Sequence, residues 1–259
     1  MFVILTGDGC GYSLLHYSIQ GFPGREETVT MDEEEKKRFY RSMVLPALLV
    51  LLLWLIKITE VAFHTSFADF GLEPQTVKGL RGILFSPLLH ADWAHLSSNS
   101  VPLFLLSSGL FYYYGKRAGT IFMLCWLVTG LWVWIFAADT GIHIGASGLV
   151  YALATFHFTG GILRREPRMM AFSMLVVFLY GSLVWGISPD FFPGKNISWQ
   201  SHLLGGLAGI LIAFGFRKEG PQRKTYVWED EDEDDDFEGN EEDEPEDEEM
   251  KQQQAGKDL

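Results

Sequence analysis

Cysteine is scarce in this sequence, with only Cys10 and Cys125 among 259 residues. Cys10 lies in the N-terminal part of the chain and Cys125 lies in an apolar segment, so the two form neither a disulfide framework nor the paired spacing of a zinc site. The sequence also contains no H-E-x-x-H motif. These absences exclude a disulfide-stabilised scaffold and the commonest zinc sites.

Basic charge is also sparse, with 20 Lys and Arg residues against 33 Asp and Glu. A basic surface for nucleic acid is therefore not expected. Seventeen of the acidic residues fall within 229–249, a stretch without Lys or Arg, and the rest of the chain carries 16 acidic and 20 basic residues. The negative balance thus belongs to one segment, and residues 219–259 are predicted to be an acidic, disordered tail.

Residues 1–30 lack the basic start of a signal peptide. A polar stretch follows, and its basic residues are Lys36, Lys37, Arg38 and Arg41. This composition predicts an N-terminal segment, residues 1–38, that ends at the cytoplasmic surface of a membrane.

Hydrophobic residues, in contrast, make up 48% of the chain. They gather in six segments, each near the roughly 20 residues that cross a bilayer as a helix. The approximate bounds of these segments are 42–58, 94–114, 118–138, 147–163, 169–187 and 199–216. The sequence therefore predicts an all-α, polytopic membrane protein with a six-transmembrane-helix domain at residues 39–218. The long connection 59–93 has apolar residues of its own and is expected to fold onto the helices or into the membrane.

The distribution of Lys and Arg predicts the orientation of these helices. Thirteen of these residues lie before the first segment, in the connections after the second and fourth, or just after the sixth. The opposite side has Lys78, Arg81 and Lys195, with Lys57 expected to extend toward that interface. Both termini are therefore predicted to be cytoplasmic, and the second, fourth and sixth segments begin at the outer face.

The fourth segment begins with Gly145-Ala146-Ser147-Gly148. A serine at a helix start can expose its hydroxyl while free backbone N–H groups point toward the carbonyl that it attacks. Small residues that only pack closely in a membrane would give the same pattern. Asp139, in the loop before Ser147, is a weak candidate for a supporting carboxylate.

The sixth segment begins with His202, followed by Gly205 and Gly209. The G-x-x-x-G spacing lets two helix backbones approach closely. If the neighbour is the fourth segment, His202 can take the proton of Ser147 as a general base. Tyr151, one turn after Ser147, is then placed to contact the His202 ring.

The second segment carries His95 and Asn99, which are four residues apart and share one helix face. They are candidates for hydrogen-bond donors to a developing oxyanion, or for polar contacts between helices. A metal site at His90 and His95 is the rival interpretation, but the spacing is unsuitable and Asp92 is the only acid nearby. His143 is expected to make a loop hydrogen bond and His157 to pack between helices.

Together these residues resemble the rhomboid family of intramembrane serine proteases, over roughly residues 79–216. The matching motifs are G-x-S-G at Gly145 to Gly148, H-x-x-x-x-H-x-x-x-N from His90 to Asn99, and H-x-x-G-x-x-x-G at His202, Gly205 and Gly209. The family often has Trp-Arg in the outer loop where this chain has Leu80-Arg81, which puts the usual anchoring of that loop in doubt.

The resemblance implies that Ser147 is the nucleophile and His202 the base. It also implies that His95, Asn99 and the Ser147 N–H form the oxyanion hole, and that Tyr151 packs on His202. The implied activity is cleavage of transmembrane helices of protein substrates near the outer face of a bacterial inner membrane, without a cofactor or metal. A non-catalytic rhomboid-like binder of membrane proteins is the alternative. A channel or transporter is a third hypothesis. The chain shows no inverted repeat of the kind that many transporters contain, which argues against it.

Overall fold

The computed structural model describes residues 32–138, 141–179 and 198–221. Within these residues the chain is helical, and its β structure is limited to one isolated bridge between Leu72 and His143. The longer helices are α1 (Glu33–Ala62), α3 (Trp93–Tyr114), α4 (Ala118–Phe136), α5 (Ser147–Arg164), α6 (Pro167–Leu179) and α8 (Trp199–Gly215). The all-α prediction is confirmed for this part of the chain.

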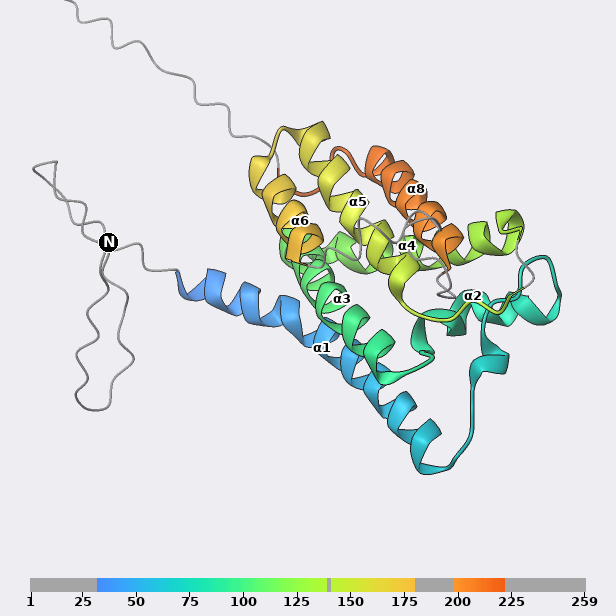
Figure 1. Ribbon diagram of the computed structural model, residues 1–259. Helices are drawn as coiled ribbons and strands as arrows, with labels where there is room; N and C mark the ends of the chain where they lie inside the picture. The colour runs from blue at the N-terminus through green and yellow to red at the C-terminus, as the bar shows by residue number, and fades with distance from the viewer. Residues whose placement is uncertain (1–31, 139–140, 180–197, 222–259) are drawn as a thin grey trace, which may run out of the picture. The chain divides into compact units, whose positions relative to one another are not determined.

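Six helices occupy the six predicted apolar segments (Figure 1). By length and composition, Glu33–Ala62 and the stretch Trp93–Phe136, which joins α3 to α4, are long and apolar enough to cross a bilayer. The helices α6 and α8 are shorter apolar helices, and residues 180–187 of the fifth predicted segment lie outside the described residues. A crossing by each of the six helices therefore stays a prediction.

Helix α1 begins well before the predicted start at residue 42. Three glutamates, Glu33, Glu34 and Glu35, lie in its first turn, where negative charge is favourable to the helix dipole. Lys36 and Lys37 then pair with Glu33 and Glu34 at 2.8 Å. The polar stretch thus continues the helix, which the apolar pattern alone did not indicate.

Helix α5 is central to the packing, since it contacts α3, α4, α6 and α8, with α8 its most extensive neighbour. Figure 1 shows α5 flanked by α6 and α8. Consecutive residues along it are buried, from Gly148 to Ala154. A helical stretch that is buried on every side belongs to the interior of its bundle. Ser147, the first residue of α5, therefore directly precedes the most buried stretch of this helix.

The connection 59–93 folds onto the helices, as predicted. It forms η1 (Ala68–Phe70), η2 (Lys78–Arg81), α2 (Gly82–Phe85) and η3 (Ser86–Leu88), and Leu72 within it is only 1% exposed. Arg81 donates a hydrogen bond of 2.7 Å to the Asp69 carbonyl and lies over the Phe70 ring, 4.5 Å from its centroid. Arg81 thus anchors this connection although Leu80 precedes it.

Lys57 is paired near the end of α1, and its expected position at the membrane interface stays a prediction. Its ammonium donates to the Glu60 carboxylate at 3.1 Å and to the carbonyls of His90 and Ala91 at 3.0 and 2.9 Å. Glu60 also accepts the backbone N–H of Phe67 at 2.7 Å. A buried carboxylate is costly without partners, and Glu60 has two, the Lys57 ammonium and the Phe67 N–H. Since Lys57 and Glu60 also bond to residues of the outer connection, the pair ties the end of α1 to that connection.

Candidate active site

The loop before Ser147 is shaped by Gly145. Its φ of +115° is a conformation that L side chains rarely adopt, and a Cβ atom there would lie 2.5 Å from Cε1 of His95. The Gly145 N–H donates to the Ser86 carbonyl at 2.9 Å, which attaches the loop to η3. This arrangement brings the backbone that precedes Ser147 directly against the His95 side chain.

His202 lies in the first turn of α8, and its Nε2 is 2.8 Å from Ser147 Oγ. The two helices approach closely at glycines, as the G-x-x-x-G spacing predicts. A Cβ atom at Gly205 would lie 2.1 Å from the Gly148 carbonyl oxygen, and one at Gly209 would lie 2.0 Å from that of Ala152. Backbone contact between α5 and α8 therefore brings the hydroxyl and the imidazole within hydrogen-bonding distance.

Tyr151 lies one turn after Ser147 and stacks on His202. The ring centroids are 4.4 Å apart and the ring planes differ by 20°. Both side chains are buried, with 5% and 8% exposure. Stacked aromatic rings attract each other, so this contact favours the imidazole orientation in which Nε2 faces Ser147.

His95 and Asn99 lie on the face of α3 that meets Gly145. Asn99 Nδ2 would be 3.6 Å from a Cβ atom at Gly145, and it is buried without a hydrogen-bond partner among the described residues. Buried amides are nearly always paired, because an unsatisfied donor lowers stability. The unpaired donor of Asn99 is thus available to an acceptor beside Gly145 and Ser147.

His90 stands next to His95, with the ring centroids 5.1 Å apart. The pKa of His90 is lowered to about 3, mainly by burial and to a smaller extent by the neighbouring His95 ring. His90 is therefore neutral near pH 7.

No group of three or more His, Cys, Asp or Glu side chains suited to a metal ion occurs among the described residues, which leaves the rival metal interpretation without geometric support there.

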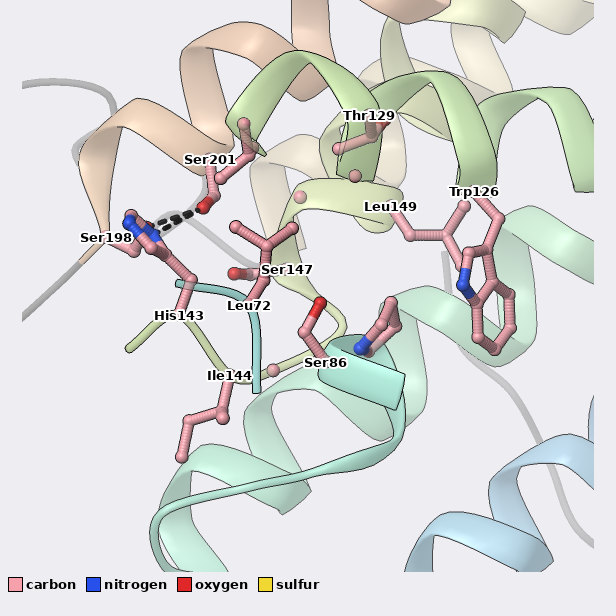
Figure 2. Close-up of a pocket in the computed structure, with 15 residues that line it drawn as sticks. Leu72, Ser86, Trp126, Thr129, His143, Ile144, Ser147, Leu149, Ser198 and Ser201 are labelled. Atoms are coloured by element: carbon pink, nitrogen blue, oxygen red, sulfur yellow. Dashed lines mark hydrogen bonds between the residues drawn. The ribbon is translucent and has the colours of Figure 1, made fainter. Parts of the chain in front are cut away.

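A small pocket of about 30 Å³ opens beside Ser147 (Figure 2). Its polar lining includes the hydroxyls of Ser86, Thr129, Ser198 and Ser201. Thr129 Oγ1 is buried and has no hydrogen-bond partner among the residues that the structure describes. A water molecule needs a cavity of roughly 10–15 Å³ together with polar partners, so the pocket can hold water next to the serine.

A larger pocket of about 260 Å³ shares Ile144 with the first as a lining residue. Lys57, Glu60 and His90 give this second pocket a polar lining. The loop that leads to Ser147 thus contributes to the lining of two pockets, and the larger one has room for several water molecules.

Other predicted residues lie apart from Ser147 or outside the described chain. His157 Nε2 hydrogen-bonds to the Leu106 carbonyl at 3.0 Å, which confirms the predicted packing between helices. Asp139 lies outside the described residues. The sequence did not single out Ser198 and Ser201, which hydrogen-bond to His143, because serines near a helix start usually serve as caps.

Comparison with known proteins gives a consistent family signal. Residues 78–219, more than half of the chain, match the model of the rhomboid domain. An uncharacterized protein of Mycobacterium tuberculosis is 29% identical over 212 residues, covering 78% of this chain and 85% of the relative. An uncharacterized protein of Mycobacterium leprae is 28% identical over 179 residues, or 67% and 70% of the two chains. A Bacillus subtilis protein named "Putative rhomboid protease YdcA" is 27% identical over 128 residues, or 49% and 62%.

Proposed function

The chain belongs to the rhomboid family, and on that premise we propose that it is an intramembrane serine endopeptidase with Ser147 as nucleophile and His202 as general base. The observation that carries this proposal is the 2.8 Å hydrogen bond between His202 Nε2 and Ser147 Oγ. That distance is within the range over which a general base removes a proton from its nucleophile.

The proposed reaction follows from this pair. Ser147 Oγ attacks the scissile carbonyl while His202 Nε2 takes the hydroxyl proton, and the carbonyl oxygen gains the negative charge. The peptide C–N bond then breaks as His202 gives that proton to the leaving amine. Water, deprotonated by His202 Nε2, next attacks the Ser147 ester. The ester C–O bond breaks as His202 returns that proton to Ser147 Oγ, which releases the acid and the free serine.

The negative charge of the tetrahedral intermediate needs hydrogen-bond donors. The backbone N–H of Ser147 lies at the start of α5, where helix N–H groups have no partner within the helix. The unpaired Asn99 Nδ2 and the adjacent His95 side chain supply two more donors. Removal of one such donor typically raises the barrier by roughly 3–4 kcal/mol.

The long apolar helices and the family make the chain an integral membrane protein. We propose six spans in a bacterial inner membrane, with both termini in the cytoplasm and Ser147 toward the outer face. Peptide bonds inside a helix are shielded, so the proposed substrates are transmembrane helices that small or helix-breaking residues allow to unwind. The small pocket beside Ser147 would hold the hydrolytic water.

A fluorophosphonate probe tests the proposal, because an activated serine attacks its phosphorus, expels fluoride and becomes phosphonylated. We expect the detergent-purified protein to be labelled, and Ser147→Ala and His202→Ala to abolish labelling. Ser97→Ala is the matched control, since Ser97 is an exposed serine on α3. A folded wild-type protein that resists the probe, yet binds transmembrane helices, would support the alternative of a non-catalytic binder.

A further inference from the structure

A cluster of three side chains lies beside the Ser147–His202 pair and takes no part in the reaction described above. His143 Nδ1 hydrogen-bonds to Ser198 Oγ and, at 3.0 Å, to Ser201 Oγ, and the two hydroxyls are 2.6 Å apart. Figure 2 shows the His143 ring directed at both serines on one wall of the small pocket. A hydroxyl both donates and accepts, so the cluster is satisfied whichever ring nitrogen carries the proton.

The backbone of His143 is fixed to the outer connection. Its N–H donates to the Leu72 carbonyl at 2.8 Å, and its carbonyl accepts the Leu72 N–H at 3.0 Å. Leu72 itself is buried. Two residues after His143, the Gly145 N–H donates a hydrogen bond to the Ser86 carbonyl. The His143 side chain therefore projects from a firmly held segment that leads directly into Ser147.

Ser198 is the N-cap residue of α8, yet its hydroxyl makes no capping hydrogen bond to the helix. A serine at this position usually caps the helix and contributes about 1 kcal/mol by doing so. Here the hydroxyl binds His143 and Ser201 instead. The first turn of α8 is thus attached to the serine loop, and this turn carries His202.

The glycine contacts between the two helices lie beyond the first turn of α8. Gly205 and Gly209 set how closely α8 approaches α5, but they lie further along α8 than His202. At the first turn, Tyr151 stacks on His202, and the Ala138 N–H donates to Gln200 Oε1 at 3.0 Å. The His143 cluster adds an attachment from the residues just before Ser147 to the residues on either side of Gln200, one of which, Ser201, is adjacent to His202.

We propose that His143 is a positioning residue that, through Ser198 and Ser201, holds the first turn of α8 so that His202 Nε2 stays in range of Ser147 Oγ. This inference rests on the proposed function and adds a residue to it. His143 acts through other residues, and misplacement of reacting groups by about 1 Å can lower a rate roughly 100-fold.

The test compares three substitutions of His143 in the full-length protein. In His143→Leu, which lacks hydrogen-bonding atoms, kcat for a transmembrane substrate should fall roughly 10- to 100-fold with KM changed less than about twofold. The rate of fluorophosphonate labelling should fall by the same factor. His143→Asn places an amide group near the Nδ1 position and should recover most of the loss, whereas His143→Gln extends the amide toward the Nε2 position and should not.

The partner serines supply a second arm. Ser201→Ala should lower kcat in the same direction, and its combination with His143→Leu should be less than multiplicative, because both changes break one attachment. Should His143→Leu fail to fold, Ser201→Ala carries the test, and a wild-type kcat in that variant would overturn the proposal. Equal activity of the Asn and Gln variants would also overturn it.

A merely structural role for His143 predicts a different result. His143→Leu would then unfold at a lower temperature while kcat and the labelling rate of the folded protein stayed at wild-type values, and that outcome contradicts positioning. The wild-type protein is measured in parallel to separate the two proposals. If it reacts in a Ser147-dependent way and His143→Leu is equally fast, only the positioning role fails. If the wild type neither cleaves nor labels, the proposed function fails as well.

Discussion

Gly205 packs so closely against Gly148 that a Cβ atom at residue 205 would lie 2.1 Å from the Gly148 carbonyl oxygen. Real Cβ atoms essentially never approach an oxygen so closely, so any larger residue at 205 must move α8 away from α5. The Ser147–His202 distance depends on this contact, since Gly148 directly follows Ser147 and His202 is one turn before Gly205.

Gly205→Ala should therefore lower the rate of fluorophosphonate labelling at least roughly tenfold, and the overlap should destabilise the fold by about 1–3 kcal/mol. Gly206→Ala is a matched control, because a Cβ atom there meets only Thr155 Cγ2, at an ordinary 3.6 Å. Labelling rate and unfolding temperature are measured for both variants. Equal effects of the two substitutions would show that the α5–α8 contact does not set the geometry of the pair.

Asn99→Ala should separate catalysis from packing. The Asn99 Nδ2 donor is buried without a partner among the described residues, so removing it should leave the unfolding temperature unchanged or slightly higher. Loss of an oxyanion donor should lower kcat roughly 10- to 1000-fold with KM little changed. The double variant with His95→Ala should lose less than the product of the single losses. Normal kcat together with lowered stability would assign Asn99 to helix packing.

The stability of the folded protein should depend on pH through His90. Its pKa of about 3 in the folded state lies below the ordinary value near 6.5 that it regains on unfolding. Between these values the unfolded state binds the extra proton, so stability falls as pH decreases below about 6.5, by up to roughly 1.4 kcal/mol per pH unit. The unfolding temperature of His90→Gln should decline less steeply than that of wild type between pH 7.5 and 5. Parallel declines would contradict a neutral, buried His90.

The six-span topology can be tested with single cysteines introduced after Cys10 and Cys125 have been replaced. Cysteines at the exposed positions Lys116 and Arg165 should react with a membrane-impermeant reagent only when the cytoplasmic face is opened. A cysteine at Val77, which is 86% exposed in the outer connection, should react in intact cells. Reaction of all three from the same side would refute the orientation deduced from the basic residues.

The ends of the helices were predictable where glycine or charged residues interrupt the apolar pattern of the sequence. Helix α3 ends at Tyr114 and α4 begins at Ala118, close to the predicted bounds, because Gly115 and two basic residues interrupt the apolar pattern. The start of α1 was missed because pairs between glutamate and lysine extend the helix with no apolar periodicity. Ion pairs of this kind stabilise a helix without leaving a hydrophobic signal.

The candidate site was predictable only in part. Ser147, His202, His95 and Asn99 stand in recognisable short motifs, so the sequence indicated the residues although their distances needed the structure. The link from His143 to Ser198 and Ser201 joins residues more than 50 positions apart, and no local pattern marks it. The same is true of Glu60, whose burial with Lys57 depends on how the outer connection folds back.

Cleavage of a transmembrane model substrate by the purified protein is the direct measure of the proposed endopeptidase activity. Wild type, Ser147→Ala, His202→Ala and the double variant are compared with Ser97→Ala, after each is shown to be folded. We expect cleavage by wild type and Ser97→Ala, and loss of activity in the other three variants. The double variant should be no worse than either single one, because the pair acts as a unit. Cleavage by Ser147→Ala at the wild-type rate would contradict the assignment of Ser147 as the nucleophile.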